Sequence, residues 1–545
     1  MDRGVRPRPL HKRNDWLDCY MAAAMLAVVL FMGATVTAAT AQTYTVLYSF
    51  DVTHGANPTF SDLLAQGQDG NLYGTVTIGG ANYIGVVFKI TPSGTLTVLY
   101  DFDSTHGNHP RGGLTLGKDG SFFGTAEAGG ASDFGTIFNI TPTGSLTTLY
   151  DFVGGSDGVY PKAPPVQGTD GNFYGTTQTT AYKISPAGRF SGLGNLPGFT
   201  FAPLILGSDG NFYGTSYTGG SQNKGAVFKL NSTGKIATLY SCDGTHGLNP
   251  VGPLVQGNDG NFYGTTLIGG TSSGGVVFKL TPQGVLTVLY NFDSVNTLNG
   301  YAPYGGLVLA SDGNLYGVTA SGGISGDGVI FKITPAGSYS VLYNFDGTHG
   351  LLPYATATQH TNGKIYGLTY GGGAYGYGVV YSFDVGLKAF VNVTSAAARV
   401  GQTVGIIGQG LTGTTSVKFN GTPATFKLVS DTYLMARVPA GATSGFVTVT
   451  TPGGTLRSSK RFRIMPVILS FSPTSGAEGT PVIITGTSFT GATKVTFGGV
   501  RATTFSVDSD TQVTATVPAG AKTGKIQITT PGGTATSATN FTVTP

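Results

Sequence analysis

Tryptophan and cysteine are almost absent from this chain of 545 residues. The one tryptophan, Trp16, and one of the two cysteines, Cys19, lie within the first 41 residues. From residue 42 onward Cys242 is the only thiol, which excludes an intramolecular disulfide and a thiolate metal cluster in that part. Glutamate occurs only at Glu127 and Glu478, so a pair of catalytic carboxylates would have to be built mainly from aspartate.

Charge is also scarce. Only 10% of the residues are charged, against about 25% in an average protein, whereas 88 residues are glycine. This composition disfavours long surface helices and favours short strands joined by tight turns. Five of the 30 basic and three of the 26 acidic residues lie in residues 1–41, which leaves a net charge of +2 for the rest. We therefore expect no nucleic-acid partner and no strong attraction to anionic lipid.

The N-terminal segment has the three parts of a secretory signal peptide. Residues 1–18 are polar and basic, residues 20–39 are apolar, and Ala39-Thr40-Ala41 forms a cleavage site. An uncleaved membrane anchor is the alternative, because the apolar run approaches the thickness of a bilayer. No comparable apolar run follows. We therefore expect a secreted or cell-surface protein with no membrane span after cleavage of residues 1–41.

One phrase recurs seven times along the chain and is its dominant feature. The phrase has the form Asp-Gly-Asn-Phe-Tyr-Gly-Thr at 170–176, 209–215 and 259–265. Its seven copies begin at Asp69, Asp119, Asp170, Asp209, Asp259, Asp312 and Asn362. The spacings are 50, 51, 39, 50, 53 and 50 residues. The sequence therefore predicts seven equivalent units.

Each unit contains four segments that are typical of strands. In the unit at 251–290 they are 253–256, 261–266, 275–280 and 285–290. Asp259-Gly260 and Thr281-Pro-Gln-Gly284 are expected to form tight turns between them. Seven repeats of four antiparallel strands predict a seven-bladed β-propeller over residues 42–390. Residues 44–50 match a fourth strand and are expected to complete the seventh blade, with residues 387–393 as the alternative.

The phrases D-G-N-F-Y-G-T, G-V-V-F-K-[IL]-T-P-x-G and L-Y-[DN]-F-D resemble the GloVer tandem repeats of bacterial choice-of-anchor proteins over residues 44–390. This resemblance implies an exported, surface-associated protein. It brings no established activity and no catalytic residues.

Residues 391–545 contain a separate duplication. Val438-Pro-Ala-Gly-Ala442 corresponds to Val517-Pro-Ala-Gly-Ala521, and Thr451-Pro-Gly-Gly454 corresponds to Thr530-Pro-Gly-Gly533. The short alternating strands predict two small β-sandwiches, over 391–465 and 466–545. These copies resemble immunoglobulin-like IPT/TIG domains, which implies spacing, adhesion or partner binding. A basic cluster in the first copy (Arg457, Lys460, Arg461 and Arg463) is expected to form a solvated face.

A second repeated motif, Asp-x-Thr-His-Gly, begins at Asp51, Asp103, Asp243 and Asp346, and it places a histidine after the fourth strand of four units. These histidines are His54, His106, His246 and His349. Equivalent positions on different blades are too far apart to share a metal ion. We therefore expect a structural motif in which aspartate caps the turn while threonine and histidine bond to local backbone. The aspartates of the Asp-Gly turns are likewise expected to form turns and not a calcium site. Cys242 is expected to be a small core residue.

The connections between second and third strands differ from unit to unit, and they are expected to share one face with the histidine loops. This face is the candidate binding face. It is expected to carry these residues: His54, His106, His246 and His349 of the histidine loops, and Tyr83, Phe134, Asn223, Tyr375 and Tyr377 at the tips of the other connections. Exposed aromatic and amide groups on a rigid scaffold are suited to binding a sugar or a peptide.

The interpretation that follows is an exported, monomeric, non-enzymatic protein for binding, adhesion or surface scaffolding, with a glycan or protein ligand and without a cofactor or metal. The alternative is an extracellular carbohydrate-active or other hydrolytic propeller. Such an enzyme needs acidic or histidine residues in one unit that its siblings lack, and His109 and Glu127 in the second unit are the candidates.

Overall fold

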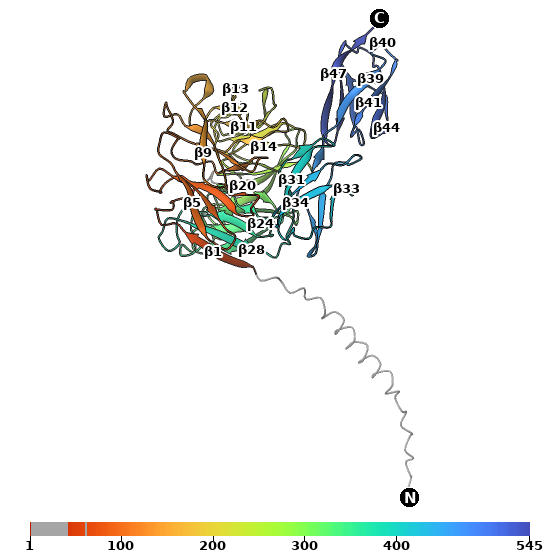
Figure 1. The fold of residues 1–545 in the computed structure, drawn as a ribbon. Coiled ribbons are helices and arrows are strands. Elements are labelled where there is room, and N and C mark those ends of the chain that lie inside the picture. Colours follow the sequence, from red (N-terminus) through yellow and green to blue (C-terminus); the bar gives the residue numbers. More distant parts are fainter. Residues whose placement is uncertain (2–41, 60–62) are drawn as a thin grey trace. The chain divides into compact units, whose positions relative to one another are not determined.

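The computed structural model describes Met1, residues 42–59 and residues 63–545. The predicted signal peptide at 1–41 lies outside the described residues apart from Met1. Residues 43–384 form seven four-stranded antiparallel sheets, one for each sequence repeat (Figure 1). Two short 3₁₀ helices, η1 (Gly155–Asp157) and η2 (Thr297–Asn299), lie in connections between sheets.

Six of the sheets are made of four consecutive strands. The first is β2 (Ala65–Gln66), β3 (Leu72–Val76), β4 (Val86–Ile90) and β5 (Leu96–Asp101); the second is β6 (Thr115–Leu116), β7 (Phe122–Ala126), β8 (Thr136–Ile140) and β9 (Leu146–Asp151). The third is β10 (Val166–Gln167), β11 (Phe173–Thr176), β12 (Thr180–Ile184) and β13 (Phe190–Asn195); the fourth is β14 (Ile205–Leu206), β15 (Phe212–Ser216), β16 (Ala226–Leu230) and β17 (Ile236–Ser241). The fifth is β18 (Val255–Gln256), β19 (Phe262–Thr266), β20 (Ser273–Leu280) and β21 (Leu286–Asp293); the sixth is β22 (Val308–Leu309), β23 (Leu315–Thr319), β24 (Val329–Ile333) and β25 (Tyr339–Asn344).

The seventh sheet joins the two ends of the repeat region. It consists of β26 (Thr358–Gln359), β27 (Ile365–Leu368), β28 (Val379–Asp384) and, as its fourth strand, β1 (Thr43–Ser49). Figure 1 shows the red β1 beside β28, and their register pairs Thr43 with Asp384 and Ser49 with Val379. The expectation that residues 44–50 complete this sheet is therefore confirmed. The alternative is wrong, because β29 (Asn392–Val393) pairs with a strand of the first tail domain.

The sheets contact one another in chain order, and the last contacts the first. The first strands of neighbouring sheets touch, as β2 and β6 do, which places the first strands at the inner edge of the ring. Gln66 of the first sheet donates to Thr361 beside the seventh at 2.7 Å, and Thr361 N–H donates back to Gln66 at 3.0 Å. The fold is a closed β-propeller.

Aromatic side chains fill the space between sheets. Tyr73 stacks on Phe122 of the next sheet with ring centroids 4.1 Å apart. The equivalent pairs are Phe123 with Phe173, Tyr174 with Phe212 and Tyr213 with Phe262. Burial of these faces supplies much of the stability of the ring.

The Asp-Gly turns between first and second strands behave as expected. In the fifth sheet the Asp259 carboxylate accepts the Asn261 backbone N–H at 3.1 Å, the Asn261 side-chain amide at 2.7 Å and the Tyr263 hydroxyl at 2.8 Å. Gly260 has a φ of 83°, which a side chain would strain. The Asp259 carboxylate is therefore occupied within its own turn.

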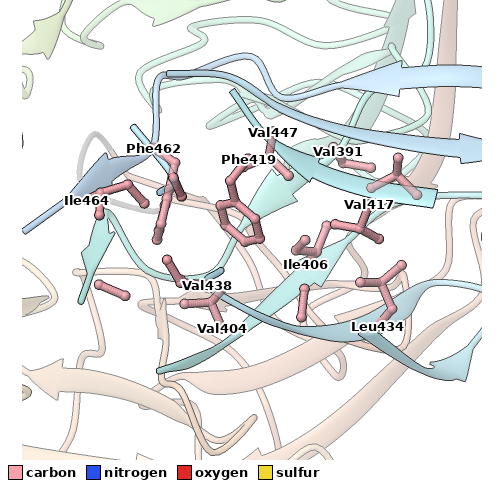
Figure 2. Close-up of a cluster of buried hydrophobic side chains, with 14 of the residues drawn as sticks. Val391, Val404, Ile406, Val417, Phe419, Leu434, Val438, Val447, Phe462 and Ile464 are labelled. Atoms are coloured by element: carbon pink, nitrogen blue, oxygen red, sulfur yellow. The ribbon is translucent and has the colours of Figure 1, made fainter. Parts of the chain in front are cut away.

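Two β-sandwiches follow the propeller. In the first, one sheet is β29, β31 (Thr403–Ile407), β35 (Tyr433–Arg437) and β34 (Phe426–Ser430), and the other is β33 (Thr422–Ala424), β32 (Ser416–Phe419), β36 (Val447–Thr451) and β37 (Gly454–Arg457). The parallel pair β30 (Ala397–Ala398) and β38 (Arg463–Ile464) completes it. Figure 2 shows the buried side chains between its sheets, with Phe419, Phe462 and Ile406 among them.

The second sandwich has the same order. One sheet is β39 (Val467–Ser472), β41 (Pro481–Thr487), β45 (Gln512–Thr516) and β44 (Phe505–Ser509), and the other is β40 (Ser475–Gly476), β47 (Gly533–Val543), β46 (Gly524–Thr530), β42 (Lys494–Phe497) and β43 (Val500–Arg501). Its core includes Phe489, Phe497 and Phe541. In the part of the chain that is described, no helix has the length and apolar character needed to cross a membrane.

The basic cluster of the first sandwich is not the uniformly solvated face that the sequence predicts. Arg463 is only 7% exposed, and its guanidinium donates to the Ser208 carbonyl of the propeller at 2.7 Å. The guanidinium groups of Arg457 and Arg461 lie over the ring of Phe446, 3.5 and 5.2 Å from its centroid. Alternation along a strand indicates which side chains share a face, but it cannot tell whether another part of the chain covers that face.

Candidate functional site

The four Asp-x-Thr-His-Gly loops are closed by their own side chains. Asp51 accepts the backbone N–H of His54 at 2.9 Å and contacts its Nδ1 at 2.9 Å, and Thr53 Oγ1 donates to the same carboxylate at 2.9 Å. The other three loops repeat the bonds from histidine to aspartate, at 103–106, 243–246 and 346–349. The predicted cap by aspartate is present, but the side chains of Thr53 and His54 bond to the Asp51 carboxylate and not to backbone.

These bonds also affect the acidity of the aspartates. Burial alone raises the pKa of the Asp51 carboxyl, but the hydrogen bonds from the backbone and ring of His54 outweigh it and hold the pKa below its ordinary value. The pKa values of Asp103, Asp243 and Asp346 are lowered for the same reason. The four histidines each serve a different sheet. Among the described residues no group of three or more potential metal ligands occurs.

The histidine loops lie on the same face as the connections between second and third strands, which we call the loop face. Gly80 N–H, in the connection between β3 and β4, donates to the Val52 carbonyl of the histidine loop that follows β1, at 2.8 Å. Asn57 N–H donates to the Tyr377 carbonyl of the seventh sheet at 2.8 Å, and Asn249 N–H donates in the same way to Lys224. The loops of neighbouring sheets are therefore linked, which makes the loop face a rigid surface.

The predicted residues at the loop tips are spread over four sheets. Tyr83 is 67% exposed, and Tyr375 and Tyr377 are 62% and 41% exposed in the seventh sheet. Phe134 packs on Tyr160 with centroids 5.9 Å apart, and the Asn223 side chain accepts the Gly219 N–H at 2.8 Å. Only Tyr375 and Tyr377 share one loop, so the structure does not unite the set into a site.

A different group of residues does converge, at the inner side of the loop face. It occupies two slots in each repeat: the residue shortly before the first strand and the residue shortly after the second strand. Because first strands lie at the inner edge, these slots form an inner rim. We call the following residues the inner-rim cluster: Arg111, Glu127, Lys162, Phe201, Tyr217, Tyr304, Tyr354 and Tyr370.

The charged part of the inner-rim cluster joins the second and third sheets. The Glu127 carboxylate follows β7 and lies 2.9 Å from the Lys162 ammonium, which precedes β10. The Arg111 guanidinium forms an ion pair with the same carboxylate. The side chains of Glu127 and Lys162 are 18% and 13% exposed, so this triad is largely shielded from water.

The aromatic part begins where the charged part ends. The Lys162 ammonium lies 5.0 Å from the centroid of the Phe201 ring, and Phe201 contacts Tyr217 edge to face at 5.4 Å. A cation over an aromatic face is attracted by the negative face of the ring. The charged and aromatic residues thus form one continuous contact path from the second to the fourth sheet.

Three tyrosines form a second contact group in the sixth and seventh sheets. Tyr304 contacts Tyr354 with centroids 4.8 Å apart, and Tyr354 contacts Tyr370 at 5.4 Å. Burial, with a smaller contribution from Tyr217, raises the pKa of Tyr304. All three tyrosines are half-buried.

The residues proposed for an enzymatic alternative are arranged differently from a catalytic pair. The His109 carbonyl accepts the Glu127 backbone N–H at 3.1 Å, but His109 Nδ1 lies 2.9 Å from the Asn108 side chain. The Glu127 carboxylate is engaged by Arg111 and Lys162. This arrangement positions a carboxylate between two cations and does not place it beside the imidazole.

Sequence reasoning singled out Glu127 but missed the other seven members of the inner-rim cluster. A signal for them was present. In a chain whose repeats share turns, core residues and histidine loops, the slot before the first strand changes from Arg111 to Lys162, Val251 and Tyr304. Variation at equivalent positions of a repeated scaffold is the pattern that a ligand site produces.

The fold defines the class of the molecule, an all-β protein that combines a β-propeller with two immunoglobulin-like sandwiches. The chain belongs to the Gloeobacter/Verrucomicrobia repeat family, whose profile matches residues 32–184, 177–381 and 286–425. The IPT/TIG domain profile matches residues 390–463 and 466–543. Both resemblances seen in the sequence are thereby confirmed.

Solved structures similar to this chain include two from surface glycan-binding systems. SGBP-B from a complex xyloglucan utilization locus in Bacteroides uniformis is 23% identical, with a TM-score of 0.15, over 28% of this chain and 48% of that one. A surface glycan-binding protein of Prevotella bryantii is 19% identical, with a TM-score of 0.22, over 28% and 41%. PorZ, a surface component of the type-IX secretion system of Porphyromonas gingivalis, is 14% identical, with a TM-score of 0.42, over 75% and 59%. The chain spans about half the length of the first two. No curated protein matches it.

Proposed function

We propose that this protein is an exported, non-enzymatic binding protein whose propeller recognises its ligand through the inner-rim cluster of the loop face. The main support for the proposal is that the residues in the inner-rim slots change from sheet to sheet, whereas the rest of the scaffold repeats. The histidine loops repeat and satisfy their own polar groups, as structural elements do. The inner-rim slots instead differ from sheet to sheet, and the cluster holds an arginine, a glutamate, a lysine, a phenylalanine and four tyrosines.

The chemistry of the cluster suits binding better than catalysis. It offers aromatic faces, phenol hydroxyls and a shielded ion-paired triad, all held by short strands of a rigid ring. Nucleophilic or acid–base catalysis needs a reactive group beside a proton acceptor of matched pKa. Glu127, held between two cations, does not have that environment.

The first tail domain contacts the opposite end of the strands. Thr432 Oγ1 donates to the Gln68 carbonyl at 2.7 Å, and Gln409 donates to Thr361 Oγ1 at 3.2 Å. Together with the bond from Arg463 to Ser208, these contacts reach turns of the first, fourth and seventh sheets. The tail therefore acts as a scaffold on the turn side and leaves the loop face for recognition.

Binding of the purified protein to arrays of glycans and peptides tests this function. We expect saturable binding of a ligand to the unaltered protein. Tyr354→Ala should bind that ligand at least about tenfold more weakly, because the variant removes the ring that links Tyr304 to Tyr370. Lys118→Ala, at an exposed turn beside Asp119, is the control and should bind normally. Equal binding by Tyr354→Ala and the unaltered protein, or turnover of the ligand, would contradict the proposal.

A further inference from the structure

We propose that the inner-rim cluster binds an acidic oligosaccharide, with a sugar carboxylate on the side of Arg111 and Lys162 and sugar rings against the tyrosines. This inference rests on the proposed function and adds the chemical class of the ligand to it. Three features of the described rim support it: the balance of its charges, the arrangement of its aromatic rings and the extent of the contact path.

The charges of the cluster are unequal. Arg111 and Lys162 are two cations, and Glu127 is the one carboxylate that pairs with both. The other described inner-rim slots hold uncharged residues, namely Thr77, Gln178, Val251, Leu267 and Ala320, and the slot before β2, at residue 61, lies outside the described residues. The described rim therefore has one positive charge in excess. A guanidinium and an ammonium that share one carboxylate have donor N–H groups left for a second carboxylate.

Shielding strengthens this preference for an anion. The side chains of Lys162 and Arg111 are 13% and 30% exposed, so a bound carboxylate would meet them with few competing waters. Charge-assisted hydrogen bonds in such surroundings are stronger than those at an open surface. A neutral ligand would not use the remaining N–H donors of these two cations as a carboxylate does, which is the basis for selectivity toward the acid.

The tyrosines supply the complementary half of the site. Tyr304, Tyr354 and Tyr370 contact one another edge to face and are half-buried, so each ring offers only part of its surface. An aromatic ring provides an apolar face, and its phenol oxygen provides a hydrogen-bonding group at the edge. A sugar ring has the matching character, with an apolar C–H face and hydroxyls around its edge.

The extent of the cluster favours a chain over a single sugar. Its members come from the second, third, fourth, sixth and seventh sheets, and they form two contact groups around the closed ring, one from Arg111 to Tyr217 and one from Tyr304 to Tyr370. A monosaccharide carboxylate at Lys162 would leave Tyr354 and Tyr370 unused. An oligosaccharide that carries carboxylates reaches both groups, whereas an acidic peptide is the competing class that the test must separate.

Isothermal titration with three sets of probes tests the class of ligand. The probes are oligogalacturonates and oligomannuronates, their methyl esters, and an oligoglutamate peptide. We expect the free-acid sugars to bind at least about tenfold more tightly than the esters, and more weakly as salt is raised. The oligoglutamate should bind more weakly than the sugars, because it has no ring to place against the tyrosines.

Variants of opposite charge sharpen the test. Lys162→Met should weaken binding of the free acid about tenfold and leave binding of the ester nearly unchanged. Glu127→Gln should instead tighten binding of the free acid, because it frees both cations from their shared partner. Tyr354→Ala should weaken both probes. Lys118→Met, on the turn side, is the matched control and should bind like the unaltered protein.

The outcomes separate this inference from the proposed function. If a neutral glycan or a peptide binds best and Tyr354→Ala abolishes that binding, the binding function stands and the acidic class is wrong. The class is also wrong if Glu127→Gln weakens binding of the free acid in a variant that melts normally. If binding depends on Tyr375 and not on Tyr354, or if nothing binds, the inner-rim site itself is wrong.

Discussion

Tyr44 of β1 stacks on Tyr343 of β25 with ring centroids 4.1 Å apart and an angle of 5° between the ring planes. The two residues belong to the seventh and sixth sheets, and Tyr44 also packs on Tyr381 of β28 at 5.2 Å. Its hydroxyl donates to the His349 carbonyl at 2.7 Å. One side chain near the start of the propeller thus fastens the closing strand to two sheets.

Replacement of this residue should weaken the closure of the ring. We expect Tyr44→Ala to lower the free energy of unfolding by about 2–4 kcal/mol, because it removes a large ring that packs against other aromatic side chains. Tyr44→Phe keeps the stacking and should cost about 1 kcal/mol for the lost hydrogen bond. Denaturant titration gives both values, and hydrogen exchange should show the loss of protection first in β1 and β28. Equal stability of Tyr44→Ala and the unaltered protein would contradict the role of this contact.

The turn aspartates should contribute to stability through the bonds they accept. Asp259→Ala removes the acceptor for the Asn261 N–H, the Asn261 amide and the Tyr263 hydroxyl, and should cost about 1–3 kcal/mol. Asp259→Asn should cost less, because Asn362 already fills this slot in the seventh sheet, where its amide donates to the Tyr366 hydroxyl. Thermal melts of the two variants compare these effects. An equal loss in both would show that charge, and not turn geometry, is what matters.

His360 should make stability depend on pH. It is buried at the junction of the seventh and first sheets, where Nε2 contacts the Gly70 carbonyl at 2.9 Å and Nδ1 accepts the Asn362 N–H at 3.1 Å. Burial lowers the pKa of His360 below its ordinary value of 6.5, despite the opposing bond to Gly70. The unfolded chain therefore takes up a proton that the folded chain resists, and the free energy of unfolding falls as pH drops below about 6.5.

Melting temperatures between pH 7.5 and 5.5 measure this dependence. We expect a decline on acidification that His360→Gln reduces. The aspartates of the histidine loops, with pKa values held below the ordinary 3.8, titrate at lower pH and do not disturb this window. A decline of the same size in His360→Gln would assign it to other groups.

Cys242 should be unreactive in the folded protein. Its side chain is 3% exposed, and burial, reinforced by the Asp243 carboxylate, raises the pKa of the thiol to about 12. A thiol reagent at pH 8 meets almost no thiolate under these conditions. We expect labelling by a maleimide only after denaturation. Rapid labelling of the native protein, followed by mass spectrometry, would contradict a core position.

The repeated features of the molecule could be predicted from the sequence because each is a local pattern stated several times. Asp259-Gly260 marks a turn, the Phe-Tyr pairs mark buried strands, and the match of residues 44–50 to a fourth strand leads to β1. In the fifth sheet the predicted strands 275–280 and 285–290 correspond to β20 and β21, which extend two or three residues further at one end. The ends of strands in one unit are therefore predicted less exactly than the features that all seven units share.

Features that depend on contact between distant segments escaped prediction. Lys162 and Phe201 precede different sheets, and no local pattern indicates that they meet. The alternation of basic residues around Arg463 predicts an exposed side chain, but the propeller covers it. The ring geometry brings Lys162 and Phe201 together because they occupy equivalent slots of neighbouring repeats. Arg463 is covered because the first tail sandwich contacts a turn of the propeller.

The closing strand also has a consequence for biogenesis. β1 is synthesised before every other strand, yet its partner β28 is the last strand of the propeller to be made. The pairing has a very high contact order, and until it forms both strands have unpaired edges. Until the propeller has been synthesised, the nascent chain therefore exposes an unpaired strand edge that can pair with another chain. If β1 pairs with β28 of a second molecule, the result is a domain-swapped dimer, so refolding at low protein concentration should favour the monomeric ring.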